Sequence, residues 1–235
     1  PDQVFGASAG NSGIDGTLTP EETGDYTVHE TAGAPGTVGT DGDAGTARAE
    51  ITGNRLLGGA GDDVIELIVE VSGEGVTELI FEGNEIDGGT GHDTADFSEL
   101  GAALNVDLDA ESFAVGDGAE DNAISAIENL IATMFDDTIR GSASNETLNG
   151  GAGDDVLSGG GGQDLFVFDE GDGADSIEDF AGDLIDLSSH SGAVDFSSLV
   201  IVDTAEGAQI SFATGDSILL QGVAASELDE THFTF

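Results

Sequence analysis

Residues 148–168 read LNGGAGDDVLSGGGGQDLFVF, a stretch that looks like a flexible glycine linker until it is written in units of nine. Residues 150–158 then become GGAGDDVLS and residues 159–167 become GGGGQDLFV. Both units place an aspartate at position six, Asp155 and Asp164, and a large apolar residue at position eight. A pattern that returns at a fixed period indicates a repeat architecture, in which each copy folds into the same structural unit.

The same register continues upstream into residues of different composition, which glycine richness alone does not explain. Five contiguous units span residues 123–167, and each keeps a carboxylate at position six and an apolar residue at position eight. Separate copies occur at 58–66 and 88–96, and one more follows at 170–178 after a two-residue slip. The position-six acids of these other units are Asp63, Asp93, Glu128, Asp137, Glu146 and Asp175. Weaker windows with Asn54 and Asn84 at position six count as half-sites only.

Each unit combines a six-residue turn with a three-residue strand. Side chains alternate across a strand, so the residue at position eight is expected to point into the core. Glycines let the turn backbone adopt left-handed conformations and let carbonyl groups converge, while the aspartate supplies negative charge. Calcium takes about six to eight oxygen ligands, more than one turn provides, so two turns on successive coils are predicted to share an ion.

Asp155 and Asp164 lie nine residues apart and are therefore expected in opposite turns of one coil, serving different ions. Their partners are predicted one coil away, at a separation of eighteen residues. These partners are Asp137 or Glu146 on the preceding coil and Asp175, displaced by the slip, on the following one.

The nonapeptide GGxGxDxUx is matched fully at 150–158 and 159–167 and nearly at 58–66 and 88–96. On these residues the chain resembles RTX, haemolysin-type calcium-binding proteins. The resemblance implies an all-β fold, a right-handed parallel β-roll of these repeats with a C-terminal antiparallel β cap. It also implies several calcium ions held by the position-six aspartates and by carbonyl groups of the glycine turns. The candidate metal-binding residues carried over are Gly58, Gly59, Gly61, Asp63, Gly88, Gly89, Gly91, Asp93, Asp137, Gly150, Gly151, Gly153, Asp155, Gly159, Gly160, Gly162, Asp164, Gly171, Gly173 and Asp175.

Some units depart from the family pattern. Glu128 and Glu146 replace aspartate at position six, and the units at 123–131 and 132–140 contain no glycine. Little metal binding is expected in those two units.

The domain organisation follows from where the repeats lie. Residues 1–48 contain no repeat and are predicted to form a poorly packed N-terminal arm or linker. The roll is expected over 49–187, with an excursion at 67–78, read as a hairpin, and a second at 97–122 that includes a strand. Residues 188–235 are predicted to form the antiparallel cap, and their terminal ELDETHFTF is similar to the signal that type I secretion systems read.

Composition narrows the classes of partner. The 235-residue chain has 49 acidic residues against three arginines, and its formal net charge is −46. Such a chain repels nucleic acid and other polyanions and favours metal cations. Cysteine is absent, which excludes disulfides and thiolate metal sites. No stretch approaches the roughly 18 apolar residues of a membrane span, so no membrane insertion is expected.

Catalysis is not expected from this chain. Its histidines, at 29, 92, 190 and 232, show no close metal-binding spacing, and neither a nucleophile elbow nor a phosphate loop is present. The predicted function is that of a secreted calcium-binding protein, extracellular or at the cell surface, whose roll folds on binding Ca²⁺ outside the cell. Its role would be structural or adhesive, through self-assembly or a cell-surface or matrix partner. The alternative is the calcium-folding and export module of a larger secreted enzyme, exported by type I secretion machinery.

Overall fold

The computed structural model describes residues 3–8, 25–32, 47–52, 55–71, 76–116 and 121–235. These residues fall into two units, one formed by residues 1–101 with 111–127 and the other by residues 102–110 with 128–235. Each unit is built from β-strands, and the only helices among the described residues are three single 3₁₀ turns near the C-terminus. The all-β expectation is confirmed.

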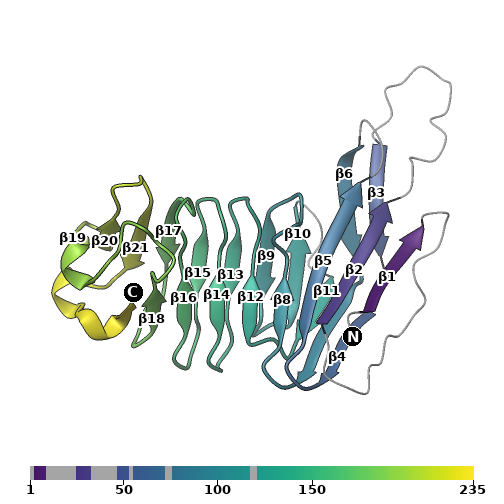
Figure 1. Cartoon of the computed structure of the whole chain (residues 1–235), viewed down its shortest axis with the longest axis horizontal. Coiled ribbons are helices and arrows are strands. Elements are labelled where there is room, and N and C mark those ends of the chain that lie inside the picture. Colours follow the sequence, from purple (N-terminus) through teal and green to yellow (C-terminus); the bar gives the residue numbers. More distant parts are fainter. Residues whose placement is uncertain (1–2, 9–24, 33–46, 53–54, 72–75, 117–120) are drawn as a thin grey trace. The chain divides into compact units, whose positions relative to one another are not determined.

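The second unit is a parallel roll, with the chain passing back and forth between two sheets (Figure 1). One sheet contains β12 (Asn129–Ile131), β14 (Thr147–Asn149), β16 (Leu165–Val167), β18 (Leu184–Asp186) and β22 (Phe233–Thr234), each parallel to the next. The other contains β9 (Leu104–Asp107), β13 (Thr138–Arg140), β15 (Val156–Ser158), β17 (Ala174–Ile177) and β21 (Ser217–Gln221), also parallel. Consecutive strands from β12 to β18 alternate between the sheets, so two repeat units make one coil.

The strand register gives the length of each coil. Leu130 pairs with Leu148, and Leu148 pairs with Phe166, so these partners are eighteen residues apart. The next coil is longer, because Leu157 pairs with Ile177 and Phe166 pairs with Ile185. The position-eight side chains point inward as predicted, and Leu148, Leu157 and Phe166 have no solvent-exposed surface. Apolar side chains from both sheets therefore fill the space between them.

The C-terminal segment closes this unit as an antiparallel cap. β19 (Val200–Asp203) and β20 (Gly207–Ser211) run antiparallel to each other, and β20 runs antiparallel to β21. The 3₁₀ turns are η1 (Phe196–Ser198), η2 (Ala225–Glu227) and η3 (Glu230–His232). At β21, Ile218 pairs with Asp175, so an apolar side chain takes the place that an acid holds on the coil before. The predicted antiparallel cap is confirmed.

The first unit is also built mainly from parallel strands. One sheet contains β1 (Gln3–Ser8), β2 (Asp25–Ala32), β5 (Val64–Val71) and β8 (Thr94–Asp96). A second contains β4 (Arg55–Ala60), β7 (Glu85–Thr90) and β11 (Asn122–Ser125), with β10 (Ser112–Val115) antiparallel to β11. β3 (Ala47–Thr52) and β6 (Val76–Glu82) form a separate parallel pair. Tilted contacts join the rings of Phe81, Phe97 and Phe113, with centroids 5.7 and 5.5 Å apart, in the core of this unit.

The structure tests three expectations outside the repeats. The hairpin predicted over 67–78 is wrong, because β5 and β6 belong to different sheets; residues 72–75, the expected turn, lie outside the described residues. The strand expected within 97–122 is confirmed as β9, but it pairs in parallel with β13 and is part of the roll rather than of an excursion. Within 1–48, where an arm or linker was predicted, β1 and β2 are sheet strands, and residues 9–24 and 33–46 lie outside the described residues.

Candidate metal centre

The position-six acids form a buried ladder along each edge of the roll. The side chains of Asp137, Asp155, Asp164 and Asp175 are at most 4% exposed. The Asp137 amide donates a 2.7 Å hydrogen bond to Asp155 Oδ1, and the Asp155 amide donates one of 3.0 Å to Asp175 Oδ1. On the other edge the Glu146 amide donates to Asp164 Oδ1 at 2.9 Å. The predicted stacking of Asp155 between Asp137 and Asp175, and of Asp164 on Glu146, is confirmed.

The same link occurs in the first unit. Asp63 and Asp93 are buried, and the Asp63 amide donates a 2.8 Å hydrogen bond to Asp93 Oδ1. The half-site at Asn84 differs, because its partner one coil away is Asn122 rather than an acid. The Asn84 amide and its side-chain Nδ2 both donate to Asn122 Oδ1, at 3.0 and 2.9 Å. This amide pair stacks two coils with no buried charge.

Glycines let successive turns approach more closely than side chains would permit. Gly151 has a φ of +83°, and a Cβ built on it would lie 1.9 Å from the carbonyl oxygen of Thr133 on the preceding coil. Left-handed φ values are shared by the predicted residues Gly59, Gly61, Gly89, Gly91, Gly153, Gly160, Gly162, Gly171 and Gly173. The first glycines of the turns have a second role: a Cβ on Gly150 would lie 2.2 Å from Asp155 Oδ2, and one on Gly159 would lie 2.2 Å from Asp164 Oδ2. Gly58 and Gly88 similarly face carbonyl oxygens, of Gly88 and Ala126.

Gly151→Ala is therefore expected to destabilise the calcium-loaded roll by about 1–3 kcal/mol, the usual cost of one strongly disfavoured backbone conformation. Urea unfolding in excess calcium measures the loss. Gly161→Ala is the matched control, because a Cβ there would meet its nearest atom, Ala143 Cα, at an ordinary 3.7 Å. Equal stability losses in the two variants would contradict the close approach of the turns.

The Asp155 carboxylate lacks enough hydrogen-bond donors to stabilise its charge. Asp155 Oδ2 is buried and has no hydrogen-bond partner. Burial, together with the negative charges of Asp137 and Asp172, raises the pKa of Asp155 to about 7. Burial, with a further contribution from the negative charge of Asp155, raises the pKa of Asp175 to about 8. Burial, with a further contribution from the negative charge of Glu146, raises the pKa of Asp164 to about 7. A carboxylate held in this way is stabilised by a proton or by a bound cation.

The surroundings of Asp155 suit a hard cation. Its unpartnered oxygen lies beside the glycine turn, and the chemistry available there consists of carboxylate and backbone carbonyl oxygens, the ligands that calcium prefers. A cation bound there would neutralise the acids that burial destabilises. Within the described residues, no group of three or more histidine, aspartate or glutamate side chains is arranged to hold a metal ion on side chains alone.

Sequence reasoning missed a second ladder, on the outer side of the turns. The side chains at position five accept hydrogen bonds from the backbone amide of the next coil: Asp136 from Asp154 and Asn145 from Gln163, at 2.9 and 2.8 Å. Asp62 and Asp154 make the same contact with the amides of His92 and Ala174. The recurring pairs Asp-Asp and Asn-Glu at positions five and six were the available signal. The position-five side chain therefore accepts a hydrogen bond from the following coil, whereas the position-six carboxylate accepts one from the preceding coil.

Two further acids near the C-terminal end were also missed. Asp183 is 4% exposed, and its Oδ1 accepts from the Asp164 amide at 3.0 Å, so it continues the ladder. Asp179 accepts from the Ser158 hydroxyl and from the amides of Gly159 and Gly160, at 2.7–2.9 Å. Neither lies in a glycine-glycine unit, which is why the motif did not reveal them.

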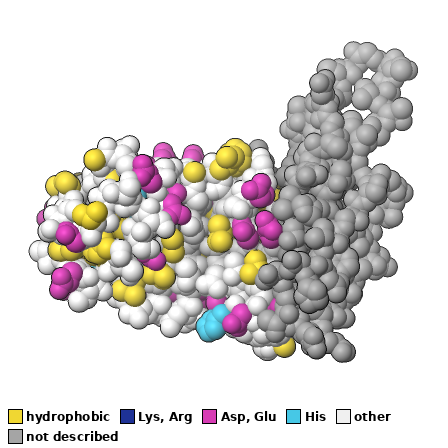
Figure 2. Space-filling model, in the orientation of Figure 1, with side chains coloured by type: hydrophobic (Ala, Val, Ile, Leu, Met, Phe, Trp, Pro, Cys, Tyr) yellow, Lys and Arg dark blue, Asp and Glu magenta, His cyan; other side chains and the backbone are white. Residues whose placement is uncertain are grey.

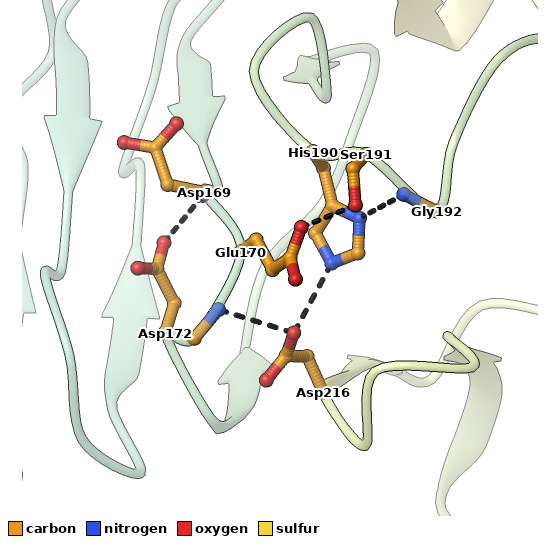
Figure 3. Close-up of polar contacts among 8 residues, drawn as sticks. Asp169, Glu170, Asp172, His190, Ser191, Gly192 and Asp216 are labelled. Carbon is orange, nitrogen blue, oxygen red and sulfur yellow. Dashed lines mark hydrogen bonds and ion pairs between the residues drawn. The ribbon is translucent and has the colours of Figure 1, made fainter.

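A buried histidine fastens the last turn of the roll to the cap (Figure 3). His190 Nε2 lies 3.2 Å from Asp216 Oδ2, and its Nδ1 accepts from the Gly192 amide, so Nε2 carries the proton in this tautomer. The Gly171 amide also donates to Asp216 Oδ2, at 3.2 Å, and the His190 ring packs on Phe212 with centroids 4.0 Å apart. These contacts hold the turn that contains Gly171 and Asp175 against the cap.

Comparison with known proteins agrees with this geometry. A family model described as the RTX calcium-binding nonapeptide repeat, in four copies, matches residues 51–66 and 131–166. These ranges contain Asp63, Asp137, Asp155 and Asp164, whereas Asp93 and Asp175 lie outside them. No curated protein matches the chain. Among the described residues, none of the helices has the length and apolar character needed to cross a membrane.

Proposed function

Because this chain is a calcium-binding repeat protein of the RTX type, we propose that calcium binding at its acidic glycine turns drives the roll to fold outside the cell. The observation that carries this proposal is Asp155 Oδ2, a buried carboxylate oxygen with no hydrogen-bond partner in a turn that matches the repeat fully. Without a cation, the ladder places several buried acids one above another inside the fold. With cations bound, the same acids stabilise it, and binding energy becomes folding energy.

The expected affinity agrees with folding after export. Calcium sites in extracellular modules have dissociation constants of roughly 10⁻⁴ to 10⁻³ M, so they are filled outside a cell and empty inside it. The net charge of −46 adds repulsion that keeps the calcium-free chain expanded. Figure 2 shows acidic side chains spread over the visible face of the described residues. We propose that residues 188–235 carry the signal that type I secretion machinery reads.

Outside the cell, a structural or adhesive role is the first candidate, and the edge of the cap supports it. β19 is the last strand of its sheet, and its Val200 and Val202 are 58% and 48% exposed. An exposed apolar edge strand is a template for pairing with another chain. Light scattering in calcium, compared with EGTA, tests assembly through this edge. Calcium-dependent growth in particle size that Val200→Thr/Val202→Thr abolishes supports the role, and particles that stay monomeric in calcium contradict it.

The second candidate is the folding and export module of a larger secreted enzyme, supported by the similarity of the C-terminal end to secretion signals. Fusing the chain behind an unrelated passenger and assaying export by a type I system tests this role. Export of the passenger only when residues 188–235 are present supports it. Catalysis by the chain itself is not proposed, and nucleic acid is not expected as a partner of so acidic a protein.

A further inference from the structure

Two turns next to the glycine turns are closed by their own side chains. In the turn 132–137, the Thr133 amide donates a 2.7 Å hydrogen bond to Asp137 Oδ2, and the Thr133 hydroxyl donates to the same oxygen at 2.9 Å. The Phe135 amide donates to Thr133 Oγ1 at 3.1 Å, which fixes the hydroxyl in place. The carboxylate therefore has donors for both of its oxygens, because Oδ1 also accepts from the Leu104 amide at 2.6 Å.

The turn 141–146 repeats this arrangement with different residues. The Ser142 amide donates to Glu146 Oε2 at 3.2 Å, and the Ser142 hydroxyl donates to Glu146 Oε1. The Ser144 amide donates to Ser142 Oγ at 3.1 Å, as Phe135 does to Thr133. In both turns a hydroxyl residue at position two, four before the acid, satisfies the position-six carboxylate.

In the glycine turn 150–155, the amide of the position-two residue does not donate to the position-six acid. The Gly151 amide, at position two, donates to Asn149 Oδ1 at 2.8 Å and not to Asp155. Glycine has no hydroxyl, and Asp155 Oδ2 is left buried without a donor. In the turn 159–164, the Gly160 amide likewise donates away from the position-six acid, to Asp179 Oδ2 at 2.8 Å.

We propose that the residue at position two decides whether a turn takes a cation: Thr133 and Ser142 occupy the place of the ligand and close their turns, whereas glycine leaves the carboxylate open. This inference rests on the proposed calcium-binding function and names where along the roll calcium acts. It assigns cations to the turns with glycine at position two, 58–63, 88–93, 150–155, 159–164 and 170–175.

The closed turns also provide a surface on which the neighbouring coil of the roll can form. They are consecutive in the chain, on either side of β13, and each is stacked directly against an open turn, Asp137 against Asp155 and Glu146 against Asp164. A coil whose turns need no cation offers a formed edge on which the first cation-requiring coil can dock. Thr133 and Ser142 are therefore positioning residues for calcium binding in the next coil.

The opening variant S142G/S144G/E146D tests the proposal, because it turns residues 141–149 into GGAGNDTLN, a full match to the repeat. Its matched control is E146D, which supplies the aspartate and keeps both hydroxyls. Calcium bound per chain is measured by equilibrium dialysis and elemental analysis at saturating calcium. The opening variant is expected to bind at least one more ion than the wild type, and the control to bind the wild-type number.

A second pair of variants reports on the hydroxyl alone. Thr133→Val is expected to raise the calcium concentration at the folding midpoint, by up to about fivefold for one net hydrogen bond, while Thr133→Ser leaves it unchanged. An opening variant with the wild-type ion count, or a Thr133→Val midpoint equal to that of Thr133→Ser, overturns the proposal. If the wild-type chain binds no calcium at all, the proposed function fails instead, so the two failures are distinguishable.

Discussion

Asp155→Asn is expected to weaken calcium-driven folding by at least about 10-fold, the smallest usual loss when even a group that only supports a metal ligand is removed, while raising the β signal that remains without calcium. Asparagine keeps an oxygen that can accept from the Asp137 amide, as Asp155 Oδ1 does. The substitution removes a buried carboxyl group, whose pKa burial raises to about 7. The chain already contains one neutral stacking pair of this kind, because Asn84 and Asn122 join two coils through their side-chain amides. Calcium titrations followed by circular dichroism measure both effects.

Asp154→Asn is the matched control for this variant, because it makes the same chemical change at the neighbouring residue. Asp154 lies on the outer ladder, exposed, and its Oδ1 accepts from the Ala174 amide, a contact that asparagine can keep. The control is expected to shift the calcium midpoint by less than about twofold, since exposed charges are screened by solvent. If Asp154→Asn and Asp155→Asn weaken calcium binding equally, total charge and not the buried ladder controls binding.

The calcium-free protein is expected to lose stability as the pH rises from about 5 to 9. Burial raises the pKa of Asp155 and Asp164 to about 7 and that of Asp175 to about 8, above the ordinary aspartate value of 3.8. The folded state therefore binds protons more tightly than the unfolded chain. Its stabilisation by these groups is complete below about pH 4 and is lost as the pH rises through 7 and 8, with release of about three protons. The β signal in circular dichroism, recorded in EGTA at a series of pH values, measures the folded fraction and hence this loss.

Calcium should reverse the trend, because protons and calcium compete for the same carboxylates. At a fixed, subsaturating calcium concentration, stability is expected to rise with pH over the same range. The double variant Asp155→Asn/Asp175→Asn removes two of the carboxyl groups whose pKa burial raises, and it is expected to flatten the slope in EGTA. A calcium-free stability that rises with pH, or a slope unchanged in the double variant, would show that the buried acids are not responsible.

The repeating part of the fold could be predicted because the nine-residue period determines where its strands, its core side chains and its acids lie. A carboxylate and an apolar residue two apart, returning every nine residues, gave the parallel strands, the inward side chains such as Leu148 and Phe166, and the stacking of Asp155 on Asp137. Where the period breaks, prediction failed. β9 is a roll strand although Leu104 stands in the acid position, and β5 and β6 look like a hairpin because local alternation does not reveal which sheet a strand joins.

The candidate site was predictable only as far as the motif describes it. The motif leaves position five unspecified, and in a chain with 49 acids an exposed aspartate such as Asp136 carries little information before its contacts are known. Thr133 and Ser142 were missed for the opposite reason. The motif identifies a turn by its glycines. A turn in which a hydroxyl group donates to the acid therefore looks like a degenerate copy of the repeat.

The most direct test of the account is the far-ultraviolet circular dichroism of the intact chain, with its hydrodynamic radius, during a calcium titration from EGTA to millimolar free calcium. Buried acids that need a cation predict an expanded chain with little β signal in EGTA and a cooperative change to a compact, β-rich protein. Magnesium at the same concentration is the control, because its strict octahedral geometry suits irregular carbonyl turns poorly. The same β signal and the same radius in EGTA and in calcium would contradict the account.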